Sequence, residues 1–259
     1  MPEMADSAWV PGIVSSAKAS KAAPRHMATV RITHWITALC FFALLLSGIE
    51  VLISHPRFYW GEDGNVLMQP LFTLPIPASR AKVPTGYGYV LPDQNGWSRS
   101  LHFEAAWAVV LTGAFYVIAG LIGGHFGRNL KPARTDLRWS ALAKSVADHL
   151  HFRRPSESEA ASYNVLQRLA YLVVVFVLFP LMIWTGLAMS PAIVSVAPSV
   201  ATILGGQQSA RTLHFFGTIL LVLFVLVHIG MVWLSGFGSR MRAMITGQAA
   251  EPPAVTGQG

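Results

Sequence analysis

Four long apolar segments divide the chain, and polar, proline-rich or charged stretches separate them. Each segment is long enough to cross a bilayer core about 30 Å thick as a helix of roughly 20 residues. We find no convincing sequence repeat that relates them. The pattern predicts an all-α membrane protein, a bundle of four transmembrane helices at about 31–53, 101–123, 165–189 and 212–235.

Composition agrees with this pattern. The chain has 259 residues, of which 53% are hydrophobic and 12% charged, whereas soluble domains carry about 25% charged residues. One cysteine, Cys40, excludes an intrachain disulfide, a thiolate zinc site and an iron–sulfur cluster bound by this chain alone. Residues 1–28 lack the apolar core of a signal peptide. We expect disordered tails at 1–28 and 244–259, and one folded domain over 29–243.

Basic residues predict the orientation of the bundle. Fourteen of the nineteen Lys and Arg residues lie in or next to the two terminal segments and the segment between the second and third spans. Lys and Arg concentrate on the cytoplasmic side of membrane proteins. Both termini are therefore predicted to be cytoplasmic, in the inner membrane of a bacterium. The net charge of +7 then reflects topology, and we expect no nucleic-acid partner.

The loop over residues 54–100 is placed on the periplasmic side by this orientation. It is rich in proline and contains several Trp and Tyr residues. Long loops in compact proteins are usually functional or disordered. Two interpretations fit equally: an ordered platform for a partner protein, or a belt of aromatic residues at the membrane interface.

Two histidines in the last apolar segment carry the strongest chemical signal. His214 and His228 are separated by 14 residues. Fourteen helical residues rise ~21 Å and return to within roughly 40° of the same face. Ionisable residues inside a membrane are costly and mark functional sites. The spacing suits two stacked cofactors, one near each leaflet.

The predicted topology gives each of these histidines a partner at its own depth. His102 lies near the outer end of the second span, level with His214, and His34 lies near the inner end of the first span, level with His228. Paired imidazoles from facing helices are natural axial ligands of a low-spin haem. Zinc would need more ligands, usually thiolates or carboxylates. A single buried histidine would by default have a hydrogen-bonded structural role, but four in this arrangement favour two haems.

An arginine precedes three of the histidines by three residues: Arg31, Arg99 and Arg211. Residues three apart are neighbours on a helix surface, and guanidinium groups suit carboxylates. These arginines could bind haem propionates, or could simply extend to the lipid headgroups. Four glycines could likewise admit a flat macrocycle or serve ordinary helix packing: Gly48, Gly113, Gly186 and Gly217.

Several motifs resemble one known family. The residues Arg31-Ile32-Thr33-His34-Trp35 are similar to the start of bacterial di-haem cytochrome b subunits, as is the spacing of His214 and His228. The stretch 163–168, Pro180 and Thr185-Gly186-Leu187 resemble the third core helix of that family. The resemblance covers roughly residues 25–240. It is strongest to the thiosulfate reductase cytochrome b branch, in a superfamily with formate dehydrogenase gamma subunits, Ni,Fe-hydrogenase cytochromes b and bacterial cytochrome b561.

The resemblance implies a membrane anchor that binds two haem b groups and passes electrons between the quinone pool and a periplasmic oxidoreductase. That partner is expected to be a molybdopterin enzyme, reached directly or through an iron–sulfur or c-type haem protein. The family's quinone site points to Tyr163, Asn164 and Gln167, which could equally cap a helix or anchor it at the interface. The loop 54–100 is longer than that of formate dehydrogenase gamma subunits, so the docking residues do not carry over.

Two other functions compete with this one. A stand-alone cytochrome b561-type quinol oxidase would oxidise quinol without a partner subunit. A small haem-free transporter would use the histidines for its substrate, but the span interiors lack the acidic or broken-helix features usual in transporters. We therefore expect an electron-transfer subunit of an oxidoreductase complex, and not a complete enzyme.

Overall fold

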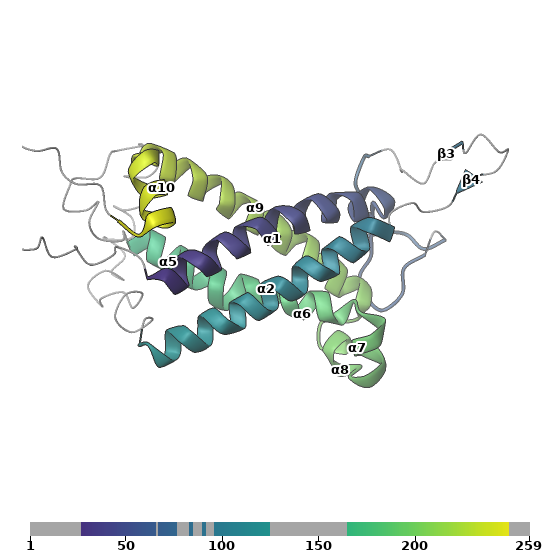
Figure 1. Ribbon diagram of the computed structural model, residues 1–259. Coiled ribbons are helices and arrows are strands. Elements are labelled where there is room, and N and C mark those ends of the chain that lie inside the picture. The colour runs from purple at the N-terminus through teal and green to yellow at the C-terminus, as the bar shows by residue number, and fades with distance from the viewer. Residues whose placement is uncertain are drawn as a thin grey trace, which may run out of the picture.

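The computed structural model describes residues 27–65, 67–76, 83–84, 90–91, 96–124 and 165–248. Helices α1 (Ala28–Ser54), α2 (Gly96–Ile122) and α9 (Gln207–Leu234) run along an elongated bundle (Figure 1). The fourth rod is built from α5 (Val165–Val173), a π-helical turn η2 (Val174–Leu178) and α6 (Phe179–Ala188). The predicted all-α bundle is confirmed, with boundaries within about five residues of those expected.

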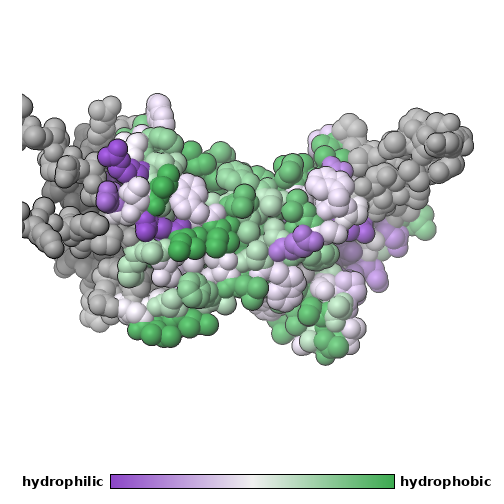
Figure 2. Space-filling model, in the orientation of Figure 1, coloured by the Kyte–Doolittle hydropathy of each residue, from purple (hydrophilic) through white to green (hydrophobic). Residues whose placement is uncertain are grey.

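The four rods have the length and composition of membrane spans. Apolar windows fall in Ala28–Ser54, Gly96–Ile122, Leu169–Ala188 and Gln207–Leu234. Large apolar side chains point outward along them: Leu39 is 74% exposed and Leu111 67% exposed. Apolar residues cover most of the middle of the bundle, and hydrophilic ones gather toward its ends (Figure 2). Soluble proteins rarely expose such surface, so the chain is a multi-pass membrane protein.

Two antiparallel helical hairpins make up the bundle. In the first, Cys40 of α1 packs with Ala105 and Val109 of α2. In the second, Leu178 packs with Leu221 of α9, and a Cβ on Gly217 would meet the Sδ of Met182. Each hairpin therefore has its own apolar contacts.

The third rod differs from the single helix predicted over 165–189, because the π-helical turn interrupts it. Pro180 follows this turn, at the start of α6. Proline has no N–H to donate to the carbonyl four residues earlier, and its ring would clash with that carbonyl. The wider turn accommodates the proline and lets the rod continue across the membrane.

The two ends of the bundle carry different short elements (Figure 1). One end, the loop end, holds the segment that follows α1 and the segment that precedes α9. These include β1 (Arg57–Phe58), its antiparallel partner β2 (Phe72–Thr73), α7 (Pro191–Val196) and α8 (Ser199–Thr202). Strands β3 (Val83–Pro84) and β4 (Val90–Leu91) form a second antiparallel pair.

The opposite end, the terminus end, holds the start of α1 and the last helix, α10 (Phe237–Thr246). Arg31 Nη1 donates to the Ile245 carbonyl at 2.7 Å, and Trp35 Nε1 donates to the Met244 carbonyl at 3.2 Å. These bonds hold α10 against α1. Helix α10 continues to Thr246, whereas we expected the C-terminal tail to begin at 244.

Candidate functional site

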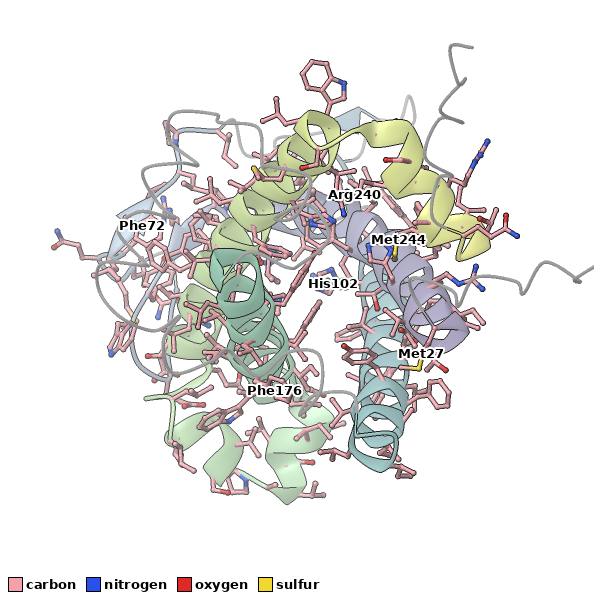
Figure 3. The ribbon with its side chains drawn as sticks, turned by 90° about the vertical axis from the view of Figure 1, so that its left-hand side faces the viewer. Met27, Phe72, His102, Phe176, Arg240 and Met244 are labelled. Carbon is pink, nitrogen blue, oxygen red and sulfur yellow. The ribbon has the colours of Figure 1, made fainter. Side chains whose placement is uncertain are left out.

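The four histidines form two pairs, each of which joins the two hairpins. The ring centroids of His102 on α2 and His214 on α9 lie 6.3 Å apart, with planes inclined at 58°. Those of His34 on α1 and His228 on α9 are also 6.3 Å apart, inclined at 52°. Figure 3, a view along the bundle, shows His102 near the centre of the ring of helices. We call these the loop-end pair and the terminus-end pair.

This separation fits two axial ligands of one metal ion. A bond between an imidazole nitrogen and a metal is about 2.0–2.1 Å long, and the ring centroid lies about 1.1 Å behind that nitrogen. Two imidazoles on opposite sides of one ion therefore have centroids about 6.3 Å apart. Among the described residues, no three His, Cys, Asp or Glu side chains gather into a metal site. The pairs thus suit an ion whose other ligands come from a macrocycle.

Two hydroxyl groups contact the loop-end pair. Ser47 Oγ on α1 lies 3.0 Å from Nδ1 of His102, and Thr185 Oγ1 on α6 lies 2.8 Å from Nδ1 of His214. Both hydroxyl-bearing residues are completely buried. Of these two residues, Thr185 was expected only as part of a family motif, and Ser47 was not predicted. A signal was available, since a hydroxyl residue followed by glycine precedes an Arg-x-x-His helix in each hairpin.

Aromatic rings surround the terminus-end pair. The Trp35 ring meets His34 edge to face, with centroids 5.3 Å apart. The His228 ring stacks on Phe224 at 5.8 Å and meets Tyr171 of α5 at 6.2 Å in a T-shaped contact. These side chains pack apolar surface against the imidazoles.

The four singled-out glycines have different neighbours. A Cβ on Gly48 would lie 3.5 Å from Cε1 of His102, and one on Gly186 would lie 3.8 Å from Cε1 of His214. A Cβ on Gly217 would lie 2.6 Å from Met182 Sδ, so this glycine serves helix packing. Gly113 faces open space. Two of the four therefore border the loop-end pair.

Arg211 and Arg31, two of the arginines that precede the histidines, bind backbone carbonyls. Arg211 donates through Nη2 to the carbonyls of His55 and Arg57, and its guanidinium lies 4.9 Å from the centre of the Phe58 ring. Arg31 donates to α10, while its buried Nε has no hydrogen-bond partner among the described residues. Arg99 is exposed on the first turn of α2. Propionate binding stays a prediction, for which Arg31 Nε is a suitable donor.

Part of the predicted periplasmic loop is fastened to the start of α9. The Gly61 carbonyl accepts bonds from the backbone N–H groups of Gln208 and Ser209, at 3.0 and 3.2 Å. Thr212 Oγ1 donates to the Tyr59 carbonyl at 2.8 Å. Phe58 is 2% exposed, between the rings of Phe72 and Phe215. Residues 55–62 thus form an ordered segment that is bonded to α9 beside the loop-end pair.

Only one of the three predicted quinone residues falls in the part of the chain that the structure describes. Tyr163 and Asn164 lie outside the described residues, and Gln167 falls in the first turn of α5. Their role stays a prediction.

Comparison with known proteins identifies the family. The sequence profile described as prokaryotic cytochrome b561 matches residues 25–247. A protein of Azospira oryzae with the provisional name protein-methionine-sulfoxide reductase subunit YedZ1 is 29% identical over 214 residues, which cover 81% of this chain and 90% of that protein. A protein of Cupriavidus necator, provisionally named a Ni/Fe-hydrogenase B-type cytochrome subunit, is 28% identical over 230 residues, covering 84% and 82%. No solved structure matches significantly.

Both relatives are named as subunits of redox enzymes, a reductase and a hydrogenase. The chain belongs to the prokaryotic cytochrome b561 family, whose members are membrane electron-transfer proteins that carry haem b.

Proposed function

We propose that the chain is the di-haem cytochrome b subunit of an oxidoreductase complex. One haem b would be held by His102 and His214, and the other by His34 and His228. A single observation carries the proposal: both pairs have the same 6.3 Å centroid separation, at opposite ends of one bundle. If only one pair bound a haem, nothing would require the other pair to have the same centroid separation.

Haem iron, when bound, supplies one-electron chemistry at each site. The chain contributes the ligands, their orientation and a dry environment. Both sites share α9, where His214 and His228 are separated by 14 residues, or ~21 Å of helix rise. That distance covers most of a bilayer core of ~30 Å. The arrangement suits electron transfer from one membrane face to the other.

The distribution of basic residues supports an orientation with both termini in the cytoplasm and the loop end in the periplasm, in a bacterial inner membrane. A periplasmic redox protein would then meet the loop-end haem, beside the ordered residues 55–62. The proposed partner is a molybdopterin enzyme, an iron–sulfur protein or a c-type haem protein. The names of the relatives, a reductase subunit and a hydrogenase subunit, support a redox partner.

The quinone pool would exchange electrons with the terminus-end haem. Tyr163, Asn164 and Gln167 remain the candidate quinone ligands, because they immediately precede or begin the helix that carries Tyr171. Tyr171 contacts His228, so this helix leads directly to the terminus-end pair.

Haem stoichiometry tests the proposal. The purified chain in detergent should give two haem b per polypeptide in a pyridine haemochrome assay, and a quinol analogue should reduce them. An absence of haem would reject the proposal and favour the transporter. Steady quinol oxidation by the isolated chain, without a partner protein, would favour the stand-alone quinol oxidase. One haem per chain would reject the two-site assignment.

A further inference from the structure

The hydroxyls of Ser47 and Thr185 share one geometry. Ser47 Oγ lies 2.7 Å from the Ala43 carbonyl as well as 3.0 Å from the His102 ring. Thr185 Oγ1 lies 2.8 Å from the Leu181 carbonyl as well as 2.8 Å from the His214 ring. Each hydroxyl thus joins the backbone of its own helix to an imidazole of the facing helix.

The direction of these hydrogen bonds follows from counting protons. A hydroxyl has one hydrogen to donate and two lone pairs that accept. A carbonyl oxygen can only accept, so the hydroxyl hydrogen goes to Ala43 or Leu44 in one case and to Leu181 or Met182 in the other. The hydroxyl oxygen is then left to accept the Nδ1–H of the histidine, beside the carbonyls of Leu44 and Met182, which also contact the two rings. A neutral imidazole has one N–H, so Nε2 of each ring is left with a free lone pair.

The same parts occur in both hairpins. Gly48 follows Ser47 and borders Cε1 of His102, and Gly186 follows Thr185 and borders Cε1 of His214. In each hairpin a hydroxyl–glycine step on one helix faces an Arg-x-x-His segment on the next. Two independent helix pairs therefore present their histidines to the loop-end site in the same way.

We propose that Ser47 and Thr185 are matched positioning residues, which hold the Nδ1–H of His102 and His214 and direct both Nε2 atoms at one metal. This inference rests on the proposed function. An acceptor on the N–H of a ligating histidine fixes its tautomer and raises its basicity. A more basic ligand stabilises the oxidised metal, so the two hydroxyls lower the reduction potential of the loop-end haem.

Single and double alanine variants test this role. S47A and T185A should each raise the potential of the loop-end haem and leave that of the terminus-end haem unchanged, in a potentiometric titration followed by absorbance. The double variant should shift it further. S47T and T185S keep the hydroxyl and should restore the wild-type value. T218A is the matched control, because Thr218 Oγ1 donates to the backbone carbonyl of His214 at 2.9 Å and not to its ring.

A ligand-replacement experiment keeps the test decisive if the alanine variants lose haem. H102G can be supplied with imidazole, or with 1-methylimidazole, which binds a metal but has no N–H. The loop-end potential should be higher with 1-methylimidazole than with imidazole, and this difference should be smaller in H102G/S47A, where the Leu44 carbonyl is the remaining acceptor. A difference that is undiminished without Ser47 overturns the proposal, as do alanine variants that shift no more than T218A. A wild-type chain without a loop-end haem instead rejects the proposed function, and this inference with it.

Discussion

The two histidine pairs have one separation and two kinds of surroundings. Both bring imidazole centroids to 6.3 Å. The loop-end rings meet buried hydroxyls of Ser47 and Thr185, whereas the terminus-end rings meet Trp35, Tyr171 and Phe224. Ligand geometry can thus be repeated along one helix while the groups around it change. Because such groups tune a metal site, the two haems should have distinct reduction potentials.

The ends also differ in how the chain covers them. At the loop end, Arg211 and the first turn of α9 hold residues 55–62 through several hydrogen bonds. At the terminus end, Arg31 and Trp35 each donate a hydrogen bond to a backbone carbonyl of α10. A segment held by several hydrogen bonds should open locally less often than one held by fewer. Changes at the loop end are therefore expected to have the larger effects.

Replacing a histidine should have the largest effect, because it removes a ligand outright. H102A and H214A should each lower the haem content from two to one per chain, with loss of the same spectral component. H34A and H228A should both lose the other component. A pyridine haemochrome assay with a reduced-minus-oxidised spectrum measures both quantities. The pairing is wrong if H102A and H34A lose the same component.

The sequence predicted the features of this site that follow from regular patterns along the chain. It did not predict those that depend on contacts between distant segments. The histidine pairing followed from helix period and the distribution of Lys and Arg, which are regular along the chain. Ser47 was missed because a serine that bonds its own helix is common, and its signal, the Ser-Gly step that recurs as Thr185-Gly186, emerges only when the two hairpins are compared. The contacts of Arg211 with residues 55 and 57 join segments more than 150 residues apart, and local patterns carry no signal for them. The π-helical turn likewise has no periodic signature.

Removing the guanidinium of Arg211 should have the next largest effect. R211M loses two bonds to backbone carbonyls and a contact with Phe58, and hydrogen bonds to charged groups contribute about 1.5–3 kcal/mol each. We expect the loop-end haem to dissociate at a lower temperature, while the terminus-end haem is retained. Thermal titration of the two spectral components in detergent measures this.

R211K is the control for charge. Lysine keeps the positive charge but lacks the planar fork of arginine, so R211K should fall between wild type and R211M. Equal loss of both haems in R211M would show that residues 55–62 stabilise the whole bundle, and would remove the proposed difference between its ends.

A smaller effect is expected from a methyl group in the second hairpin. In G217A the new Cβ would lie 2.6 Å from Met182 Sδ. The Met182 side chain is flexible and can move aside, so the cost should lie at the low end of the about 1–3 kcal/mol typical of overpacking. The thermal midpoint should fall, with two haems still bound at room temperature. G113A is the control, since a Cβ there meets nothing within 4 Å. A greater loss of haem in G113A than in G217A would show that the macrocycle occupies the space beside Gly113.

The smallest effect should come from the terminus end, where Arg31 donates a solvent-exposed hydrogen bond to α10, at 2.7 Å. Because water competes for this bond, R31M should cost only about 1 kcal/mol, less than each bond of Arg211, or about a fivefold increase in the open population of α10. Amide hydrogen exchange over residues 237–246 should quicken accordingly, with haem content unchanged. W35F is the matched variant, since it removes the bond to Met244 and keeps an aromatic ring near His34.

The same variant decides what Arg31 does at the terminus-end pair. If its guanidinium only holds α10, then R31M and W35F should have similar effects on exchange and both should keep two haems. If the buried Nε, which has no partner among the described residues, binds a haem propionate, then R31M alone should weaken retention of the terminus-end haem. Loss of that haem in R31M as complete as in H34A would contradict the small effect expected here. Both ends of the bundle would then depend on an arginine to retain their haem.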